Sequence, residues 1–233
     1  MNTKISYRLG AIVPPANPTC EVEYPMLLPT GAVLHVSRLP VLSGDLNARN
    51  QGYIEHYKQA IQGFGSLPLD GVIIGMTGPQ YRLGAEADAA LCDQLTDEFG
   101  MKVETASLAI LNTLRRKNIK RISLLSPYPN WLTELAKSYW ESADFMVDYV
   151  HSFGDELRAY ELTNSDVLEA LKEIRTNKSE AIVLSGTGML TVDAIGAARQ
   201  EFMHPMLSSN LCSIESIFYE SKLEKNALLK KLI

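Results

Sequence analysis

Ile74-Gly75-Met76-Thr77-Gly78 ends one apolar run of the chain, and Leu184-Ser185-Gly186-Thr187-Gly188 ends another, roughly half a chain later. A second pair of turns precedes them in matching order, with Pro14-Pro15-Ala16-Asn17 in the first half and Pro127-Tyr128-Pro129-Asn130 in the second. The two half-chains therefore carry the same polar turns in the same order. This repeat predicts two similar halves that share one site, with the matching turns around it.

The secondary-structure pattern agrees with the repeat. Short runs rich in Val, Ile and Leu are typical of strands covered on both faces. They are Leu9–Val13, Val33–Ser37, Gly71–Gly75, Val103–Thr105, Arg121–Leu125, Met146–Val150, Ala181–Ser185 and Pro205–Ser208. Helical periodicity fills most gaps, over Tyr53–Phe64, Ala85–Phe99, Ser107–Arg116, Trp131–Ser142, Asp166–Thr176, Val192–Phe202, Ser213–Leu223 and the amphipathic tail Lys222–Ile233. Strands that alternate with helices predict an α/β fold with parallel sheets, and the halves, residues 1–118 and 119–233, meet near Asn118–Lys120.

The composition narrows the class of protein. The chain has 233 residues and a net charge of −5, without a basic stripe or an Arg-rich tract, which argues against nucleic acid as the main partner. The N-terminal residues have no apolar signal core, and no apolar run reaches membrane-spanning length. We therefore expect a cytoplasmic protein that has no membrane partner.

The cysteines and histidines show no metal-site or redox spacing. Cys20, Cys92 and Cys212 are widely separated, and an odd count fits no closed set of disulfides. No two of the four histidines lie at i and i+4, so no helical metal site is expected. Cys92 lies within a helical apolar pattern and is expected in the core.

The two Thr-Gly turns are the best candidates for a binding site. Ligands of parallel α/β sheets sit beyond the carboxyl ends of the strands, which is where Thr77-Gly78 and Thr187-Gly188 are expected. Glycine lets the backbone approach a ligand, and N–H groups at a strand-to-helix turn can converge on an anion. The plainer interpretation is that Thr-Gly only makes a tight turn. A dinucleotide fingerprint over Gly186–Thr191 is disfavoured because Thr191 replaces its third glycine.

Three further polar side chains stand at the mouths of strands. Asn17 and Asn130 offer amides that could recognise a carboxylate, although Asn is also a common turn residue. Tyr128 is the one phenol in these turns and could donate a hydrogen bond or a proton. The alternative for Tyr128 is a ring that simply packs within its loop.

With these residues in place, the chain resembles the aspartate/glutamate racemase superfamily, in the branch of arylmalonate decarboxylase and maleate cis-trans isomerase. The matching stretches are Gly10–Asn17, Met76–Gly78, Ser126–Tyr128 and Leu184–Ile195, so the resemblance covers essentially the whole chain. It implies two pseudo-symmetric Rossmann-like halves, each a parallel sheet flanked by helices, with the active site between them. It also implies chemistry without metal, nucleotide or pyridoxal, and some self-association into a homo-oligomer.

The sequence departs from this resemblance where the chemistry would be. Proteins of the resembled family place a cysteine immediately before the Thr or Ser of one or both turns, as acid, base or nucleophile. This chain has Met76 and Gly186 there, and neither can shuttle a proton or attack carbon. The anion-binding frame that the resemblance implies remains, so two-base racemisation and thiolate-based isomerisation are not expected.

Other residues could replace the thiols. Cys20 lies near a helix N-terminus, which can lower a thiol pKa, but it is on the wrong turn for the family role. Glu21 and Glu134 could activate a water, although surface salt bridging is the plainer expectation. A deliberately removed cysteine would explain Gly186, but Met76 is not a usual substitution for that purpose.

We are left with two functional hypotheses. The first is a cofactor-independent enzyme for a small carboxylate or dicarboxylate, a decarboxylase- or isomerase-like lyase or a hydrolase, that uses the paired Thr-Gly turns as oxyanion holes. The catalytic candidates are Thr77, Tyr128 and Thr187. The substrate-binding candidates are Pro14, Asn17, Met76, Gly78, Asn130, Ser185, Gly186 and Gly188. The second hypothesis is an inactive protein of the same fold that binds or senses a small carboxylate.

Overall fold

Two four-stranded parallel sheets form the framework of the computed structural model, which describes residues 5–174 and 178–233. The first sheet has the order β2-β1-β3-β4, and the second has the order β6-β5-β7-β8. The strands are β1 (Tyr7–Val13), β2 (Ala32–Arg38), β3 (Gly71–Ile74), β4 (Lys102–Thr105), β5 (Arg121–Ser126), β6 (Met146–Ser152), β7 (Ala181–Leu184) and β8 (Met206–Ser208). Because the second sheet repeats the order and direction of the first, the predicted α/β fold with two pseudo-symmetric halves is confirmed.

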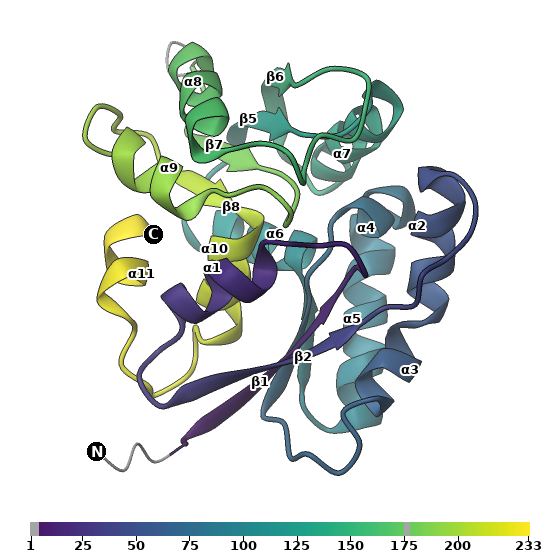
Figure 1. Cartoon of the computed structure of the whole chain (residues 1–233). Helices are drawn as coiled ribbons and strands as arrows, with labels where there is room; N and C mark the ends of the chain where they lie inside the picture. Colours follow the sequence, from purple (N-terminus) through teal and green to yellow (C-terminus); the bar gives the residue numbers. More distant parts are fainter. Residues whose placement is uncertain (1–4, 175–177) are drawn as a thin grey trace.

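Helices connect and cover the strands of both sheets (Figure 1). Those before β5 are α1 (Cys20–Leu27), α2 (Leu46–Glu55), α3 (Tyr57–Gln62), α4 (Gly78–Leu83), α5 (Ala85–Phe99) and α6 (Ala106–Arg116). Those after it are α7 (Asn130–Ser142), α8 (Asn164–Ile174), α9 (Val192–Ala198), α10 (Ser209–Ile217) and α11 (Ala227–Leu232). The central strands β3 and β7 are buried along their whole length, as their continuous apolar sequences predict.

The repeat extends to the last strand of each sheet. β4 runs directly into α6, whose N-cap Thr105 accepts a hydrogen bond from the Leu108 amide at 3.1 Å. β8 runs into α10 in the same way, and its N-cap Ser208 accepts from the Leu211 amide at 3.2 Å. Such capping satisfies an amide that would otherwise be unpaired at the helix start. The two helices pack against each other in the middle of the molecule (Figure 1).

The helix boundaries differ from the sequence prediction in several places. The segment expected as one helix over Tyr53–Phe64 is two helices, and the first begins at Leu46 because Asp45 caps it. α10 starts earlier than expected and ends at Ile217. The tail is helical only over α11, where Asn226 caps the start. The end of the expected Asp166–Thr176 helix lies outside the described residues.

A buried carboxylate ties α1 to the second half of the chain. Glu23 accepts hydrogen bonds from the amide of Val192 and the hydroxyl of Thr191, at 2.7 and 3.0 Å, and from the Asn210 side chain at 2.7 Å. α1 therefore caps the start of α9 from the other half of the molecule. This contact fixes the loop between β7 and α9, which carries the second Thr-Gly turn.

Candidate functional site

The two Thr-Gly turns meet where β3 and β7 end. The Thr187 hydroxyl donates a hydrogen bond to the carbonyl oxygen of Gly75 at 2.7 Å and accepts one from the Asn17 amide at 3.0 Å. Three loops that are far apart in sequence thus converge on one hydroxyl group. Since the single proton of this hydroxyl is already donated to Gly75, Thr187 can offer a ligand its backbone N–H but not its side-chain proton.

The Asn17 side chain is part of this junction, where it joins two loops by hydrogen bonds. It does not line the cavity described below. Its side-chain oxygen accepts from the backbone amides of Thr19 and Cys20 at 2.9 and 3.0 Å, and its amide goes to Thr187. The Thr19 hydroxyl donates to the Gly188 carbonyl at 2.7 Å. The turn before α1 is therefore joined to the second Thr-Gly turn, and Asn17 is buried there.

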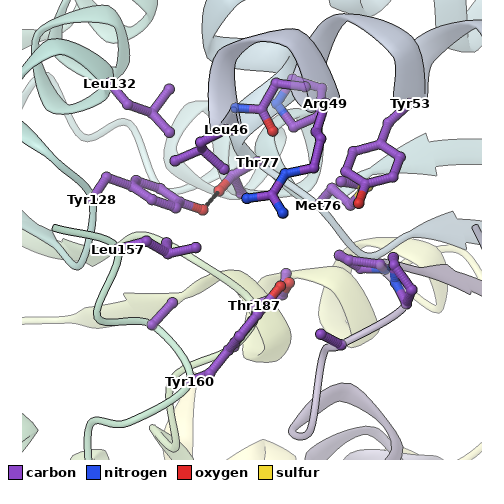
Figure 2. A pocket seen from close by; sticks show the side chains of 18 of the residues that line it. Leu46, Arg49, Tyr53, Met76, Thr77, Tyr128, Leu132, Leu157, Tyr160 and Thr187 are labelled. Carbon is purple, nitrogen blue, oxygen red and sulfur yellow. Dashed lines mark hydrogen bonds between the residues drawn. The ribbon is translucent and has the colours of Figure 1, made fainter. Parts of the chain in front are cut away.

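A cavity of about 300 Å³ opens above this junction (Figure 2). Seven of the predicted site residues line it: Pro14, Met76, Thr77, Gly78, Tyr128, Thr187 and Gly188. Four do not, namely Asn17, Asn130, Ser185 and Gly186. Asn130 is exposed at the start of α7, and its backbone N–H donates to the Asp155 carboxylate. Ser185 is buried against the hydroxyl of Tyr81 at 2.6 Å.

Tyr128 and Thr77 form a hydrogen-bonded pair across the two halves. Their hydroxyl oxygens lie 2.6 Å apart, on the wall of the cavity (Figure 2). Burial, together with the neighbouring Tyr81, raises the pKa of the Tyr128 phenol well above its ordinary value. The phenol therefore stays protonated at neutral pH and can act as a donor.

The backbone amides of the turns complete this wall. In the part of the chain that the structure describes, the N–H groups of Thr77, Gly78, Thr187 and Gly188 donate to no protein acceptor. All four residues line the cavity. Unpaired backbone donors beside a cavity, two of them at the start of α4, make a suitable site for an anion.

The two positions where the resemblance implies cysteines have distinct environments. Met76 is buried and receives a contact of 3.9 Å from the Tyr57 hydroxyl to its sulfur. Gly186 has φ +89°, and a Cβ placed there would lie 2.8 Å from Pro127 and 3.3 Å from the Tyr128 hydroxyl. The backbone at Gly186 thus has a shape that favours glycine.

No other thiol takes over at the cavity. Cys20 is buried beneath the junction, with its sulfur 3.7 Å from the Thr187 carbonyl, and burial raises its pKa to about 12. Cys92 is in the core, as predicted. Glu21 pairs with Arg38 at 2.6 Å, which is the surface ion pair expected for it.

The contributions of α2 and of the loop before α8 to the cavity were not predicted from the sequence. α2 brings Leu46, Arg49, Asn50 and Tyr53 to the cavity, and the loop brings Leu157, Ala159 and Tyr160. The close approach of Tyr160 favours glycine at position 188, because a Cβ there would lie 2.5 Å from the Tyr160 ring and the ring would have to move. Neither segment carries one of the repeated polar turns, so the repeat could not reveal them.

The cavity lining contains no Asp, Glu, His, Lys or Cys side chain. Its ionisable groups are Arg49 and the phenols of Tyr53, Tyr128 and Tyr160. Among the described residues, no cluster of three His, Cys, Asp or Glu side chains could hold a metal ion. Over the same residues, no helix has the length and apolar character needed to cross a membrane.

Comparison with known proteins identifies the family of the chain. A sequence model of the arylmalonate decarboxylase family matches residues 9–227, and the chain belongs to that family. The maleate isomerase of Alcaligenes faecalis is 23% identical to this chain over an alignment 241 residues long. The alignment covers 94% of this chain and 92% of the relative. The arylmalonate decarboxylase of Bordetella bronchiseptica is 25% identical over 214 residues, which cover 87% of this chain and 85% of that protein.

Solved structures confirm the fold. The maleate isomerase Iso of Pseudomonas putida S16 superimposes with a TM-score of 0.86 at 19% identity, over 97% of this chain and 99% of its own. A cysteine-to-serine variant of Nocardia farcinica maleate cis-trans isomerase, with a covalently bound succinylcysteine intermediate, gives a TM-score of 0.84 at 18% identity. It is matched over 97% of this chain and 98% of its own. The resemblance inferred from the sequence is thus confirmed.

Proposed function

We propose that this protein is a cofactor-independent enzyme that acts on a small carboxylate without a catalytic thiol. The observation that carries the proposal is the Thr77–Tyr128 pair, 2.6 Å between oxygens, facing the Thr187-Gly188 turn across a cavity that contains no cysteine. Relatives in the family are maleate isomerases and an arylmalonate decarboxylase. The backbone donors of the two Thr-Gly turns suit a carboxylate, and no cysteine lines the cavity beside them.

The donors of the two turns support binding of a carboxylate. The unpaired amides of Thr77 and Gly78 on one side, and of Thr187 and Gly188 on the other, can each donate a hydrogen bond to an anionic oxygen. Donors that are already oriented stabilise negative charge as it develops, and one such donor is typically worth about 3–4 kcal/mol of barrier. A reaction limited by developing negative charge therefore suits this cavity.

Decarboxylation of a malonate-type acid is the reaction that fits these groups best. The bond from the α-carbon to one carboxylate breaks, carbon dioxide leaves, and the electron pair remains on the α-carbon as an enediolate. The turns would hold the enediolate oxygens, and the Tyr128 phenol would donate a proton to the carbon. The resulting phenolate would regain its proton from water, so that the enzyme is restored.

Covalent thiol chemistry is not proposed for this chain. A relative forms a succinylcysteine intermediate. The resemblance to the family puts Met76 and Gly186 at its cysteine positions, and Cys20 is a buried thiol that does not reach the cavity lining. Proton transfer is therefore left to Tyr128 or to a water in the cavity.

A binding protein is the second candidate function. It is favoured by one observation, namely that no carboxylate, imidazole, amine or thiol lines the cavity, so that a strong base for turnover is missing from the wall. Such a protein would bind a small carboxylate in the same turns and release it unchanged.

Proton NMR in D₂O separates the two candidates. We would incubate the protein with phenylmalonate, methylmalonate, maleate and a cyclic imide, and repeat each reaction with Tyr128→Phe. As a matched control, Tyr7→Phe removes a phenol that bonds the Asp70 carbonyl far from the cavity lining. Product carrying deuterium from the wild type and Tyr7→Phe, and little from Tyr128→Phe, supports the enzyme. Ligand binding without any product would refute the enzyme proposal and favour the binding protein.

A further inference from the structure

Helix α2 presents an unpaired positive charge to the cavity. Arg49 is half-buried and lines the cavity, and its guanidinium makes no hydrogen bond or ion pair with any of the residues in the described ranges. Figure 2 shows its side chain extending from α2 into the space above Thr187. A partly desolvated guanidinium normally has an acidic partner, and the cavity lining offers none. The missing partner is therefore expected to be a ligand.

The next residue supplies a second, independent sign of a ligand. Asn50 is only 4% exposed and lines the same cavity, yet its side-chain nitrogen has no hydrogen-bond partner among the described residues. It lies against the first Thr-Gly turn, since a Cβ placed at Gly78 would be 3.1 Å from that nitrogen. Buried amide donors are rarely left unpaired, and each one costs stability until it is satisfied.

Two phenols surround this corner of the cavity. Tyr53, one turn further along α2, and Tyr160, from the other half, both line the cavity, and neither hydroxyl has a partner among the described residues. Burial raises the pKa of both, and the positive charge of Arg49 acts against the rise. The phenols therefore remain neutral donors beside a cation. Guanidinium, amide and phenol together offer several hydrogen-bond donors, one positive charge and no negative charge, which suits a carboxylate.

We propose that Arg49, with Asn50 and Tyr53, is a specificity determinant that binds a carboxylate on the substrate's tail, remote from the reacting carbon. The inference rests on the proposed function, in which the Thr-Gly turns hold the reacting carboxylate. It assigns a different group to α2: the substrate carries an additional acidic group at its far end. A substrate with a neutral or aromatic tail would leave Arg49 desolvated and unpaired.

The test compares two probes of the same shape that differ in one charge. Glutarate and its monoamide, glutaramate, each offer one carboxylate to the turns, but only glutarate offers a second to Arg49. We would measure both dissociation constants by calorimetry for the wild type, Arg49→Gln and Arg49→Lys. Arg115→Gln, which removes an exposed arginine of α6 that is absent from the lining, is the control for net charge.

We expect wild type and Arg115→Gln to bind glutarate at least about tenfold more tightly than glutaramate, as a charged hydrogen bond typically provides. Arg49→Gln should reduce this ratio to near one, and Arg49→Lys should restore part of it. A wild-type ratio near one, or a ratio that survives Arg49→Gln, would overturn the inference. The ratio of the two dissociation constants in the wild type can be measured without any variant. The inference can therefore be refuted even if Arg49→Gln folds poorly.

A separate variant reports on the proposed function. Thr77→Val removes the hydroxyl that pairs with Tyr128 beside the turn amides, so it should weaken both probes by a similar factor while leaving their ratio in place. If Thr77→Val changed neither affinity, the carboxylate would not be held beside the Thr77–Tyr128 pair as the proposed function requires, while the Arg49 ratio still stood on its own. Failure of the wild type to bind either probe would overturn both proposals.

Discussion

Replacing Gly186 with alanine should destabilise the protein in two distinct ways. The residue has φ +89°, in the left-handed region, where a non-glycine residue costs about 1–2 kcal/mol. The new Cβ would also lie 2.8 Å from Pro127, and overpacking of this kind typically costs about 1–3 kcal/mol. We therefore expect the free energy of unfolding to fall by about 2–5 kcal/mol, as the sum of these two contributions.

Gly100 provides a control that separates the two contributions. It is left-handed, with φ +65° and ψ +23°, but a Cβ there would meet no heavy atom of a non-adjacent residue within 4 Å. Gly100→Ala should thus lose only the conformational part, about 1–2 kcal/mol. Urea unfolding of the two variants and the wild type measures both losses. An equal loss in the two variants, or no loss in Gly186→Ala, would refute the reasoning.

The same two costs apply when a cysteine is introduced at position 186. Gly186→Cys meets the same backbone strain and the same contact with Pro127, and its Cβ would lie 3.3 Å from the Tyr128 hydroxyl. The loop is therefore fitted to glycine, and a single substitution would not place a thiol in the geometry of a family member that has one. We expect Gly186→Cys to be destabilised without gaining isomerase activity.

Three other perturbations test the junction, the donor and the core. Thr187→Val removes the donor to Gly75 and the acceptor for Asn17, so the free energy of unfolding measured in urea should fall by about 1–3 kcal/mol; an unchanged value would contradict the junction. Tyr128→Phe should lower turnover by about a hundredfold or more, measured by NMR, with the fold intact by circular dichroism; full turnover would exclude the phenol as donor. Burial raises the pKa of Asp88 from 3.8 to about 7, so the folded protein keeps a proton that the unfolded chain has released between these values. Stability should therefore fall as pH rises through this interval, and a slope that persists in Asp88→Asn would assign it to another group.

The strands and their pairing were readable from the sequence because their signals are local or repeated. Each expected strand is present, since an apolar run between turn residues leaves few other structures for a covered parallel sheet. The repeat further indicated that β3 and β7 occupy equivalent places. The division into an N-terminal half, residues 1–118, and a C-terminal half, residues 119–233, stays a prediction. The two parts are closely joined, since Glu23 of α1 is hydrogen-bonded to the second half.

The site was only partly readable. The Thr-Gly turns and Tyr128 followed from the repeat and its position after the strands, and they do line one cavity. Asn17 looked like an open amide, because a sequence cannot show that its partner is a hydroxyl 170 residues away. Arg49 and Asn50 gave no signal, since their meaning depends on the absence of partners in the folded cavity. The short α4, six residues long, has too few turns for helical periodicity to be visible.

The central claim, thiol-free chemistry at this cavity, is tested most directly by a cysteine-free protein. We would replace Cys20, Cys92 and Cys212 with alanine together, verify the fold by circular dichroism, and follow the malonate panel in D₂O by NMR beside the wild type. The account predicts the same deuterated product at a similar rate from both proteins. A folded cysteine-free protein that had lost turnover, while the wild type retained it, would contradict the claim and return the chemistry to a thiol.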